Sequence, residues 1–274
     1  MRIRLAVTVC AAALLLESGI ARAAVIDAVI IDTFETAQAL EVEDVSPPVV
    51  SAAHQIAAGE VVGGFRDLFV SKTAGDTGER VRARVNPSGL DLLRMTIDDA
   101  SGSVSTTYDG HDADSNPVTG VNFTGLGGID FTAGLLDAFL EMEVNFSDVG
   151  GPVRFTVFQN VAAGDKFATG TINVPGGIPS GSSVILTKEL STFVLGGTAA
   201  SLGEVFTNVG ALIMTIDATA LAQQGWDMRM NYVKTRGTID LPAASIPEPA
   251  SLTLLGLGLL SCLGFRRVVM SGSV

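Results

Sequence analysis

Short segments in which apolar and polar residues alternate are the feature that most constrains the fold of this chain. Between Arg80 and Val85, arginines occupy every second position and small apolar residues fill the positions between them. Between Leu140 and Ser147 the same pattern assigns Leu140, Met142, Val144 and Phe146 to one face and Glu141, Glu143, Asn145 and Ser147 to the other. A period of two with one polar face is typical of half-buried antiparallel strands.

Roughly ten segments of this kind, separated by clusters of Gly, Pro, Asn and Asp, predict an all-β protein. The architecture that they favour is a single antiparallel β-sandwich of jelly-roll type. Helical periodicity is confined to 131–139 and 219–224, and 41–48 reads as a loop. The expected strands are 24–34, 63–70, 80–85, 93–97, 104–108, 140–146, 153–159, 167–174, 183–190, 211–217 and 226–235.

The N-terminal end has the three parts of a secretory signal. Two arginines precede an apolar stretch at 5–16, and the small residues Ala21 and Ala23 follow it. This order predicts a signal peptide over 1–23 that is cleaved before Ala24. A retained N-terminal anchor is the alternative, although the apolar stretch is short for a membrane span.

The C-terminal end also has three parts in a fixed order. Pro247, Glu248 and Pro249 precede an apolar run at 250–265, and Arg266 and Arg267 follow it. The prolines disfavour helix, so the tripeptide is expected to be extended and accessible. As a helix the apolar run is about 24 Å long, slightly less than a hydrocarbon core of about 30 Å. The arginines act as a stop-transfer signal and favour a cytoplasmic location for that end, which leaves the tripeptide outside.

This end resembles the PEP-CTERM sorting signal of Gram-negative bacteria. Pro247, Glu248 and Pro249 stand at its namesake motif, 252–260 at its membrane segment, and Arg266 and Arg267 at its basic end, with 268–274 continuing beyond. The resemblance implies recognition by an exosortase, cleavage near the motif and a transient anchor in the inner membrane. It further implies export to the cell surface or outside, linked to exopolysaccharide or biofilm matrix. A plain C-terminal anchor helix is the alternative.

The expected organisation is a signal peptide at 1–23, a β-sandwich domain at 24–242, a linker at 243–246, a sorting and transmembrane helix at 247–267 and a short tail. The sandwich domain is similar to the jelly-roll, galactose-binding-like domains that often precede such tails. The residues that carry this similarity are Gly63–Asp67, Thr107–Gly110 and Val209–Leu212 with Ile216 and Asp217.

Charge and cysteine content limit the partners of the body. Residues 24–245 contain 12 Lys and Arg against 27 Asp and Glu, a net charge of −15. This balance argues against binding nucleic acid or an anionic membrane surface, and it would repel a uniformly acidic polysaccharide unless cations bridge the two. Cys10 and Cys262 lie in the terminal segments, so the body has no disulfide and no cysteine metal site.

The residues that could perform catalysis are few. The body contains His54 and His111 but no HExxH motif, no GxSxG motif and no cysteine. Asp98 and Asp99 are adjacent, so on a strand they would point to opposite faces and could not form a catalytic pair. We therefore expect the protein not to be an enzyme, and a glycan-active enzyme is the weakest alternative.

One acidic loop is a candidate metal site. Asp109, Asp112, Asp114 and Asn116 offer oxygen ligands within eight residues, which is the ligand type that Ca²⁺ prefers. The order of residues is not that of an EF-hand, and a solvated acidic turn is the alternative. No other cofactor is expected.

The sequence therefore predicts an exported, non-catalytic surface or matrix protein. The alternative is a carbohydrate-binding module with a structural calcium. Flat sugar platforms need exposed aromatic rings, and the body has only Trp226, Tyr108 and Tyr232 besides its phenylalanines. Trp226 is in register with Met228, Met230 and Tyr232, so a core or cross-strand role is expected for it.

Overall fold

The computed structural model of the 274-residue chain describes residues 23–43, 50–76, 78–117, 119–219 and 225–240. The chain divides into a compact unit, Val25–Ile239, and a second unit made of 1–24 and 240–274, which is described only at Ala23, Ala24 and Asp240. The expected signal peptide up to residue 22, the linker from 243, the sorting helix and the tail lie outside the described residues. Within the described ranges, no helix has the length and hydropathy of a membrane span.

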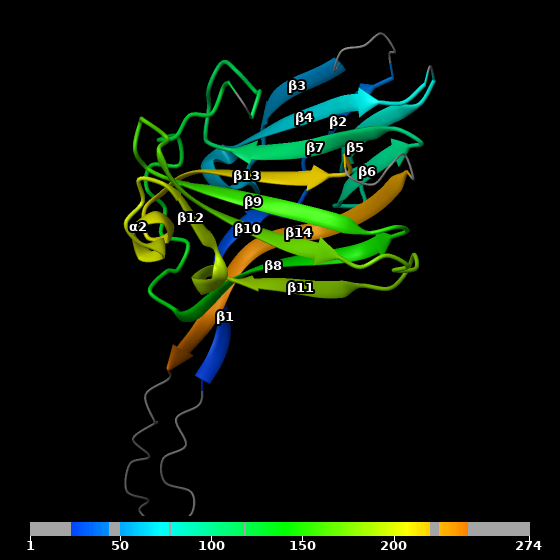
Figure 1. Ribbon diagram of the computed structural model, residues 1–274. Coiled ribbons are helices and arrows are strands. Elements are labelled where there is room, and N and C mark those ends of the chain that lie inside the picture. Colours follow the sequence, from blue (N-terminus) through cyan, green and yellow to red (C-terminus); the bar gives the residue numbers. More distant parts are fainter. Residues whose placement is uncertain (1–22, 44–49, 77, 118, 220–224, 241–274) are drawn as a thin grey trace, which may run out of the picture. The chain divides into compact units, whose positions relative to one another are not determined.

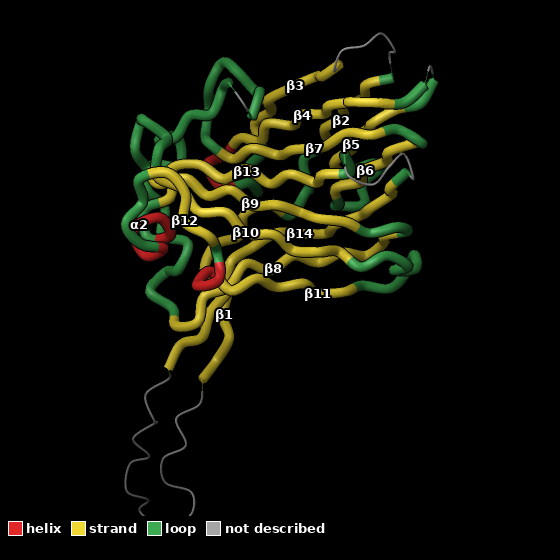
Figure 2. The backbone as a smooth tube through the Cα atoms, viewed as in Figure 1, coloured by secondary structure: helices red, strands yellow, loops and turns green. Residues whose placement is uncertain are grey.

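The compact unit consists of two antiparallel sheets (Figure 1), and Figure 2 shows how little of it is helical. In spatial order, sheet I contains β11 (Val184–Glu189), β8 (Leu136–Ser147), β14 (Trp226–Asp240), β6 (Leu93–Asp98), β5 (Arg80–Val85) and β2 (Gln38–Val42), with β1 (Ala23–Asp32) paired to β14. Sheet II contains β12 (Val194–Gly197), β10 (Lys166–Val174), β9 (Gly151–Gln159), β13 (Val209–Asp217), β7 (Ser101–Tyr108), β4 (Phe65–Ala74) and β3 (Val50–Ala57). The prediction of an all-β antiparallel sandwich is confirmed.

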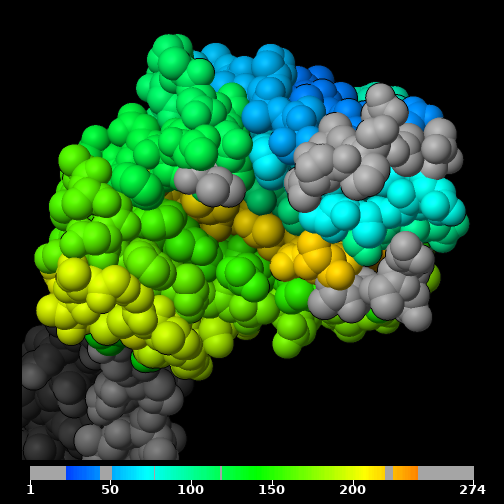
Figure 3. All heavy atoms as spheres, turned by 45° about the horizontal axis from the view of Figure 1, so that its top comes forward, coloured from blue at the N-terminus to red at the C-terminus, as the bar shows by residue number. Residues whose placement is uncertain are grey.

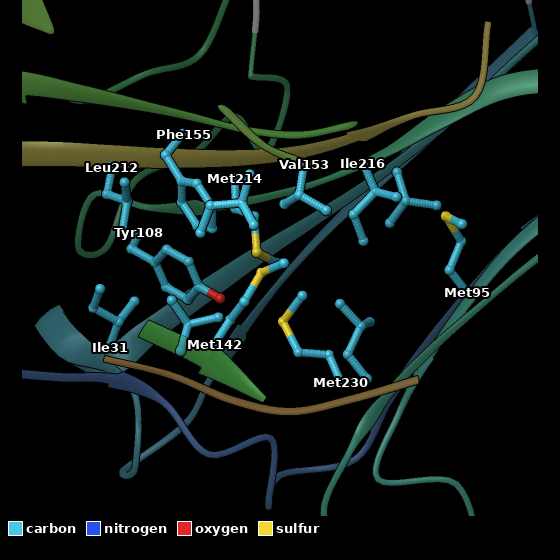
Figure 4. Packing of buried hydrophobic residues seen from close by; sticks show 14 of the residues in the cluster. Ile31, Met95, Tyr108, Met142, Val153, Phe155, Leu212, Met214, Ile216 and Met230 are labelled. Atoms are coloured by element: carbon cyan, nitrogen blue, oxygen red, sulfur yellow. The ribbon is translucent and has the colours of Figure 1, made fainter. Parts of the chain in front are cut away.

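The core lies between the sheets because each strand turns its apolar positions inward. On β5, Val81 and Ala83 are fully buried, whereas the arginines that alternate with them face outward. Figure 4 shows Phe155, Leu212 and Met214 of sheet II approaching Met142 and Met230 of sheet I. Flexible methionine side chains fill the irregular space between two twisted sheets well.

Two β-bulges change the predicted faces of β8 and β14. The pairing passes from Arg229↔Phe146 to Met230↔Val144, so Asn145 is an extra residue on β8. It then passes to Tyr232↔Glu143, so Asn231 is an extra residue on β14. An extra residue inverts the side-chain alternation beyond it. The predicted inward position of Phe146, outward position of Ser147 and shared register of Tyr232 with Met230 are therefore wrong.

The short elements are the ones that the sequence pattern did not predict. The predicted loop at 41–48 overlaps β2, while β3, β12 and the helix α2 (Leu202–Phe206) had no clear pattern. No helix forms over 131–139, where β8 begins at Leu136, and of 219–224 the structure describes only Thr219. Edge strands and a five-residue helix bury few side chains, so their sequences carry little periodicity. The 3-10 turns η1 (Val62–Gly64) and η2 (Leu190–Thr192) complete the described elements.

Candidate functional site

Strands β4 and β7 carry polar side chains on both of their faces. The two strands pair with Asp67 opposite Thr107 and Leu68 opposite Thr106. Leu68 is fully buried in the core, so Arg66 and Tyr108 also face the core, whereas Asp67 and Thr107 face away from it. One strand pair therefore positions two separate polar clusters.

The cluster on the core side is an ion-pair network around Arg66. Its Nε donates to Asp32 Oδ2 over 3.0 Å and its Nη2 to Glu60 Oε1 over 3.1 Å. The hydroxyl of Tyr108 donates to the same Asp32 oxygen over 3.1 Å. Burial raises the pKa of Asp32 to about 6, although Arg66, the Phe34 amide and Tyr108 act against this rise. Each group has a partner within the fold, so the network is structural.

The cluster on the outer side consists of three carboxylates, which we call the aspartate triad: Asp67, Asp109 and Asp112. One oxygen from each lies within 4.8 Å of the others. Asp67 and Asp109 are only 2% and 1% exposed, and Asp112 is half-buried. Asp67 comes from β4, and the other two come from the loop 109–128, which follows β7.

Close backbone packing holds this loop in place. The backbone amide of Asn122 donates to Asp109 Oδ2 over 2.8 Å. Gly125 has no room for a side chain, because a Cβ there would lie 1.5 Å from the carbonyl oxygen of Asp109. Gly110 adopts φ = +76°, which favours glycine, and packs against Gly125. In Figure 3 the green loop region packs beside the blue strands at the N-terminal edge of sheet II. Asp109 and Asp112 are thus presented by a fixed frame.

Gln55 of β3 connects the strand to the loop. It lies opposite Asp67 in the sheet, and its Nε2 donates to Asp112 Oδ1 and to the Gly110 carbonyl, each over 3.2 Å. Its Oε1 accepts the amide of Asp112 over 3.3 Å. Several buried oxygens here nevertheless have no hydrogen-bond partner among the described residues: Asp67 Oδ1, Asp109 Oδ1, Asp112 Oδ2 and Thr107 Oγ1.

The electrostatics of the triad are unfavourable for three negative charges. Burial, followed by the neighbouring charge of Asp109, raises the pKa of Asp67 far above its usual range. Burial likewise raises the pKa of Asp109, against the hydrogen bond from Asn122. The electrostatic repulsion among the three carboxylates can be lowered by a proton shared between two of them or by a bound cation.

The predicted calcium ligands do not all come together. Asp109 and Asp112 belong to the triad, whereas Asp114 closes the next turn, where its Oδ1 accepts the amide of Asn116 over 2.9 Å and its Oδ2 the hydroxyl of Thr119 over 3.2 Å. The carbonyl of Asn116 accepts the amide of Gly120 over 2.8 Å. Among the described residues, Asp67, not Asp114, lies together with the two loop aspartates.

Asp67 was not among the predicted ligands, although the sequence contained a signal for it. It is an acidic residue within the apolar stretch 63–70, and it belongs to one of the short motifs that resemble jelly-roll domains. That motif and the motif Thr107–Gly110 meet at the triad, because β4 and β7 are neighbours.

The remaining predicted residues lie elsewhere. His54 is exposed on β3, and the ring of His111 lies edge-on against Phe65 with centroids 4.8 Å apart. Ala23 and Ala24 begin β1, whereas Ala21, Pro247, Glu248, Pro249, Arg266 and Arg267 lie outside the described residues. Trp226 is fully buried and donates to Ser147 Oγ over 3.1 Å, which confirms its predicted core role.

A second polar feature crosses the outer face of sheet I, and we call it the arginine row. Arg84 pairs with Arg94, and Arg94 pairs with Arg229, so three arginines of β5, β6 and β14 occupy neighbouring positions on one face of the sheet. Like charges directly opposite each other destabilise a sheet. Asp227 lies 3.8 Å from Arg94, and Glu41 lies 4.0 Å from Arg84. Within the described ranges Arg229 has no ion pair, and its guanidinium lies over Phe146, 5.1 Å from the ring centroid.

A groove of about 550 Å³ lies near the start of β8, η2 and α2. Its lining includes Leu135, Leu190 and Phe206, with the carboxylates of Asp137 and Glu189. Neither histidine lines it, and its polar contacts include the Ser191 hydroxyl, which donates to Glu189 Oε2 over 3.3 Å.

Comparison with protein families identifies the C-terminal end. Residues 245–268 match the family described as the PEP-CTERM protein-sorting motif. The chain therefore carries this motif, which implies export and exosortase-mediated sorting to the cell surface. The match confirms the resemblance that Pro247, Glu248 and Pro249 indicated. It covers the end of the chain and leaves the body unassigned.

Comparison with solved structures finds distant likenesses to the body. One is a family 11 carbohydrate-binding module of the cellulosomal cellulase Lic26A-Cel5E of Clostridium thermocellum, at 8% identity and a TM-score of 0.36, covering 81% of this chain and 97% of that one. Another is an exo-beta-agarase, at 8% identity and a TM-score of 0.37, covering 76% of this chain and 24% of that one. The agarase AgWH50C matches at 8% identity and a TM-score of 0.37, over 57% of this chain and 23% of its own. Comparison with curated proteins finds no match.

Proposed function

We propose that this chain is an exported, non-catalytic protein of the cell surface or extracellular matrix. The observation that carries the proposal is the sorting motif at 245–268, which follows an acidic β-sandwich body. In this proposal the body is of jelly-roll type, since the chain repeatedly crosses between the two sheets. An exosortase releases it from a transient anchor in the inner membrane, and it then associates with exopolysaccharide or biofilm matrix.

The burial of the acidic groups supports a body without catalysis. Asp67 and Asp109 are the acidic pair with raised pKa values, which is a common property of catalytic acids. They are 2% and 1% exposed, so a polymer cannot reach them. The ring of His111 packs edge-on against Phe65, with centroids 4.8 Å apart.

The experiment that tests the proposal changes Glu248 to alanine in the full chain. Glu248 carries the only charge between Asp240 and Arg266, so it is expected to be a main contact for the sorting enzyme. Glu248→Ala leaves the apolar run and the arginines unchanged, and it should leave export intact while preventing release. The expected result is full-length protein in the membrane fraction and little processed protein outside the cell.

The control is Glu189→Ala, which removes the same charge from an exposed position on β11. This variant should be processed and released as the parent chain is. Normal release of Glu248→Ala would show that the tail is a simple anchor or is recognised elsewhere. That outcome would contradict the proposed function.

A second candidate function is binding of an acidic polysaccharide by the body, and the arginine row favours it. The side chains of Arg84 and Arg94 are 46% and 37% exposed. Guanidinium groups bind carboxylate and sulfate groups through paired hydrogen bonds. Five arginines on this face of three neighbouring strands (Arg80, Arg82, Arg84, Arg94 and Arg229) are set against the paired carboxylates Glu41, Asp98 and Asp227, which leaves a small local excess of positive charge despite the negative net charge. Buried Trp226 and Tyr108 cannot provide an aromatic platform.

A further inference from the structure

We propose that the aspartate triad, Asp67, Asp109 and Asp112, is a binding site for a calcium ion. The site lies between strand β4 and the loop 109–128 on the outer face of sheet II. It differs from the predicted loop site because it takes one ligand from a strand and omits Asp114. The proposal does not depend on how the chain is sorted or on what its body binds.

The spacing of the oxygens fits one calcium ion. Ca²⁺ binds carboxylate oxygens at 2.3–2.6 Å, so two ligands on opposite sides of one ion are at most about 5 Å apart. The three triad oxygens lie within 4.8 Å of one another. An ion at the centre of oxygens so spaced lies at most about 2.8 Å from each of them, so small side-chain rotations bring all three to bonding distance.

The unpartnered oxygens are an independent indication of a ligand. Asp67 Oδ1 and Asp109 Oδ1 are buried without a hydrogen-bond donor among the described residues, and so is Asp112 Oδ2. Thr107 is the cross-strand neighbour of Asp67 and is 2% exposed. Its hydroxyl oxygen is also buried without a hydrogen-bond partner among the described residues. Buried polar groups in folded proteins are nearly always paired, and leaving a carboxylate unpaired is costly. A cation would satisfy several of these oxygens at once.

The frame around the triad is suited to a preformed site. Gln55 fixes Asp112, the Asn122 amide fixes Asp109, and the sheet fixes Asp67. Partners that orient the direct ligands strengthen metal binding. Asp112 is half-buried, so it provides the side from which an ion and its remaining water ligands can enter.

The competing way to relieve the repulsion is one proton shared between Asp67 and Asp109. A bound calcium ion and a shared proton predict different results when calcium is added to the protein.

The test uses the full chain purified in mild detergent and stripped of metal with a chelator. Isothermal titration with CaCl₂ should show one ion per chain. At a calcium concentration about one hundred times Kd, Tm should rise by about 5–10 °C, because the ion binds only the folded state.

Two variants distinguish the triad from the acidic loop as a whole. Asp67→Asn should weaken calcium binding by about a hundredfold or more, since losing even an outer partner of a metal ligand costs 10–100-fold. Its metal-free form should be at least as stable as the parent, because a buried repulsion is removed. Asp114→Asn, the matched control in the same loop, should bind calcium as the parent does, since Asp114 closes a separate turn.

Asp112→Asn provides a third variant at a half-buried position, where it keeps an oxygen to accept from Gln55. It should fold and lose calcium binding, so the test does not rely on Asp67→Asn alone. No calcium bound to the parent chain would overturn the proposal in favour of the shared proton. Unchanged binding in Asp67→Asn or Asp112→Asn, or loss of binding in Asp114→Asn, would overturn this set of ligands.

Discussion

Asn145 of β8 and Asn231 of β14 are the extra residues of two adjacent β-bulges, and they hydrogen-bond to each other. Asn145 Nδ2 donates to Asn231 Oδ1 over 2.8 Å, and Asn231 Nδ2 donates to Glu143 Oε2 over 3.1 Å. The bulges turn Phe146 outward beneath Arg229 and turn Ser147 inward to Trp226. These two bulges therefore decide that Ser147, and not Phe146, faces the core.

A double-mutant cycle should measure this contact. Asn145→Ala and Asn231→Ala should each lower the free energy of unfolding by about 1 kcal/mol, because each removes one or two half-buried hydrogen bonds. The double variant should lose about 0.5–1 kcal/mol less than the sum, since the shared bond is counted once. Urea unfolding provides the measurement. Thr187→Ala, exposed on neighbouring β11, should change stability by less than about 0.5 kcal/mol. Strict additivity of the asparagine variants would contradict a coupled bulge pair.

The buried ion pair of Arg66 and Asp32 predicts a large asymmetry between two arginine variants. Arg66→Met should lower the free energy of unfolding by about 3–5 kcal/mol, because it leaves Asp32 buried without its cation. Arg80→Met removes a surface arginine that pairs with Glu41 and Asp98, and it should cost at most about 1 kcal/mol. Urea unfolding at pH 7 compares the two variants. Equal losses would show that the buried network does not carry this stability.

The raised pKa of Asp32 predicts a pH dependence of stability. Its pKa is about 6 in the folded protein against an ordinary value of 3.8, and Arg66, Glu60 and Tyr108 are the ionisable groups around it. The folded state holds the proton more tightly than the unfolded state, so this contribution to stability is complete only below the unfolded-state pKa of 3.8 and is lost as the pH rises through the folded-state pKa of about 6. Two pH units correspond to about 3 kcal/mol.

The variant Asp32→Asn isolates this contribution, because it does not titrate at that position. The free energy of unfolding of the parent chain minus that of the variant should fall by about 2 kcal/mol between pH 4 and 6, by a few tenths of a kcal/mol more up to about pH 7, and then stay level to pH 8. Urea unfolding in a chelating buffer across this range is the measurement. A difference that is constant from pH 4 upward would show that burial does not raise this pKa.

The arginine row predicts selective binding of acidic polymers. Arg94 is the centre of the row, so Arg94→Gln should weaken binding of polygalacturonate by about tenfold, the loss expected for one charged hydrogen-bonding group. Arg154→Gln makes the same change of net charge at an exposed position on β9, in the other sheet. This variant should leave binding unchanged. Calorimetric titration of the full chain, with uncharged dextran as a second ligand, provides the comparison. Equal weakening by both variants would indicate a net-charge effect without a site.

The sequence alone was sufficient for features that depend on neighbouring residues. The order of Pro247, Glu248 and Pro249 before an apolar run and two arginines is a linear signal, and the family match confirmed it. The alternation at Arg80–Val85 predicted β5 with its arginines outward, because a strand places successive side chains on opposite faces. Enough segments of that period specify two sheets with a core between them.

The tertiary structure alone decided which distant residues meet. Asp67 joins Asp109 and Asp112 because β4 lies beside β7, and strand order depends on the packing of the whole sandwich. The same holds for the arginine row, where residues of β5, β6 and β14 become neighbours through pairing. The bulges at Asn145 and Asn231 reversed the predicted faces, since one extra residue inverts every later position and no local pattern announces it. The alternation of apolar and polar residues therefore predicted the strands. The pairing of distant strands determined both the aspartate triad and the arginine row.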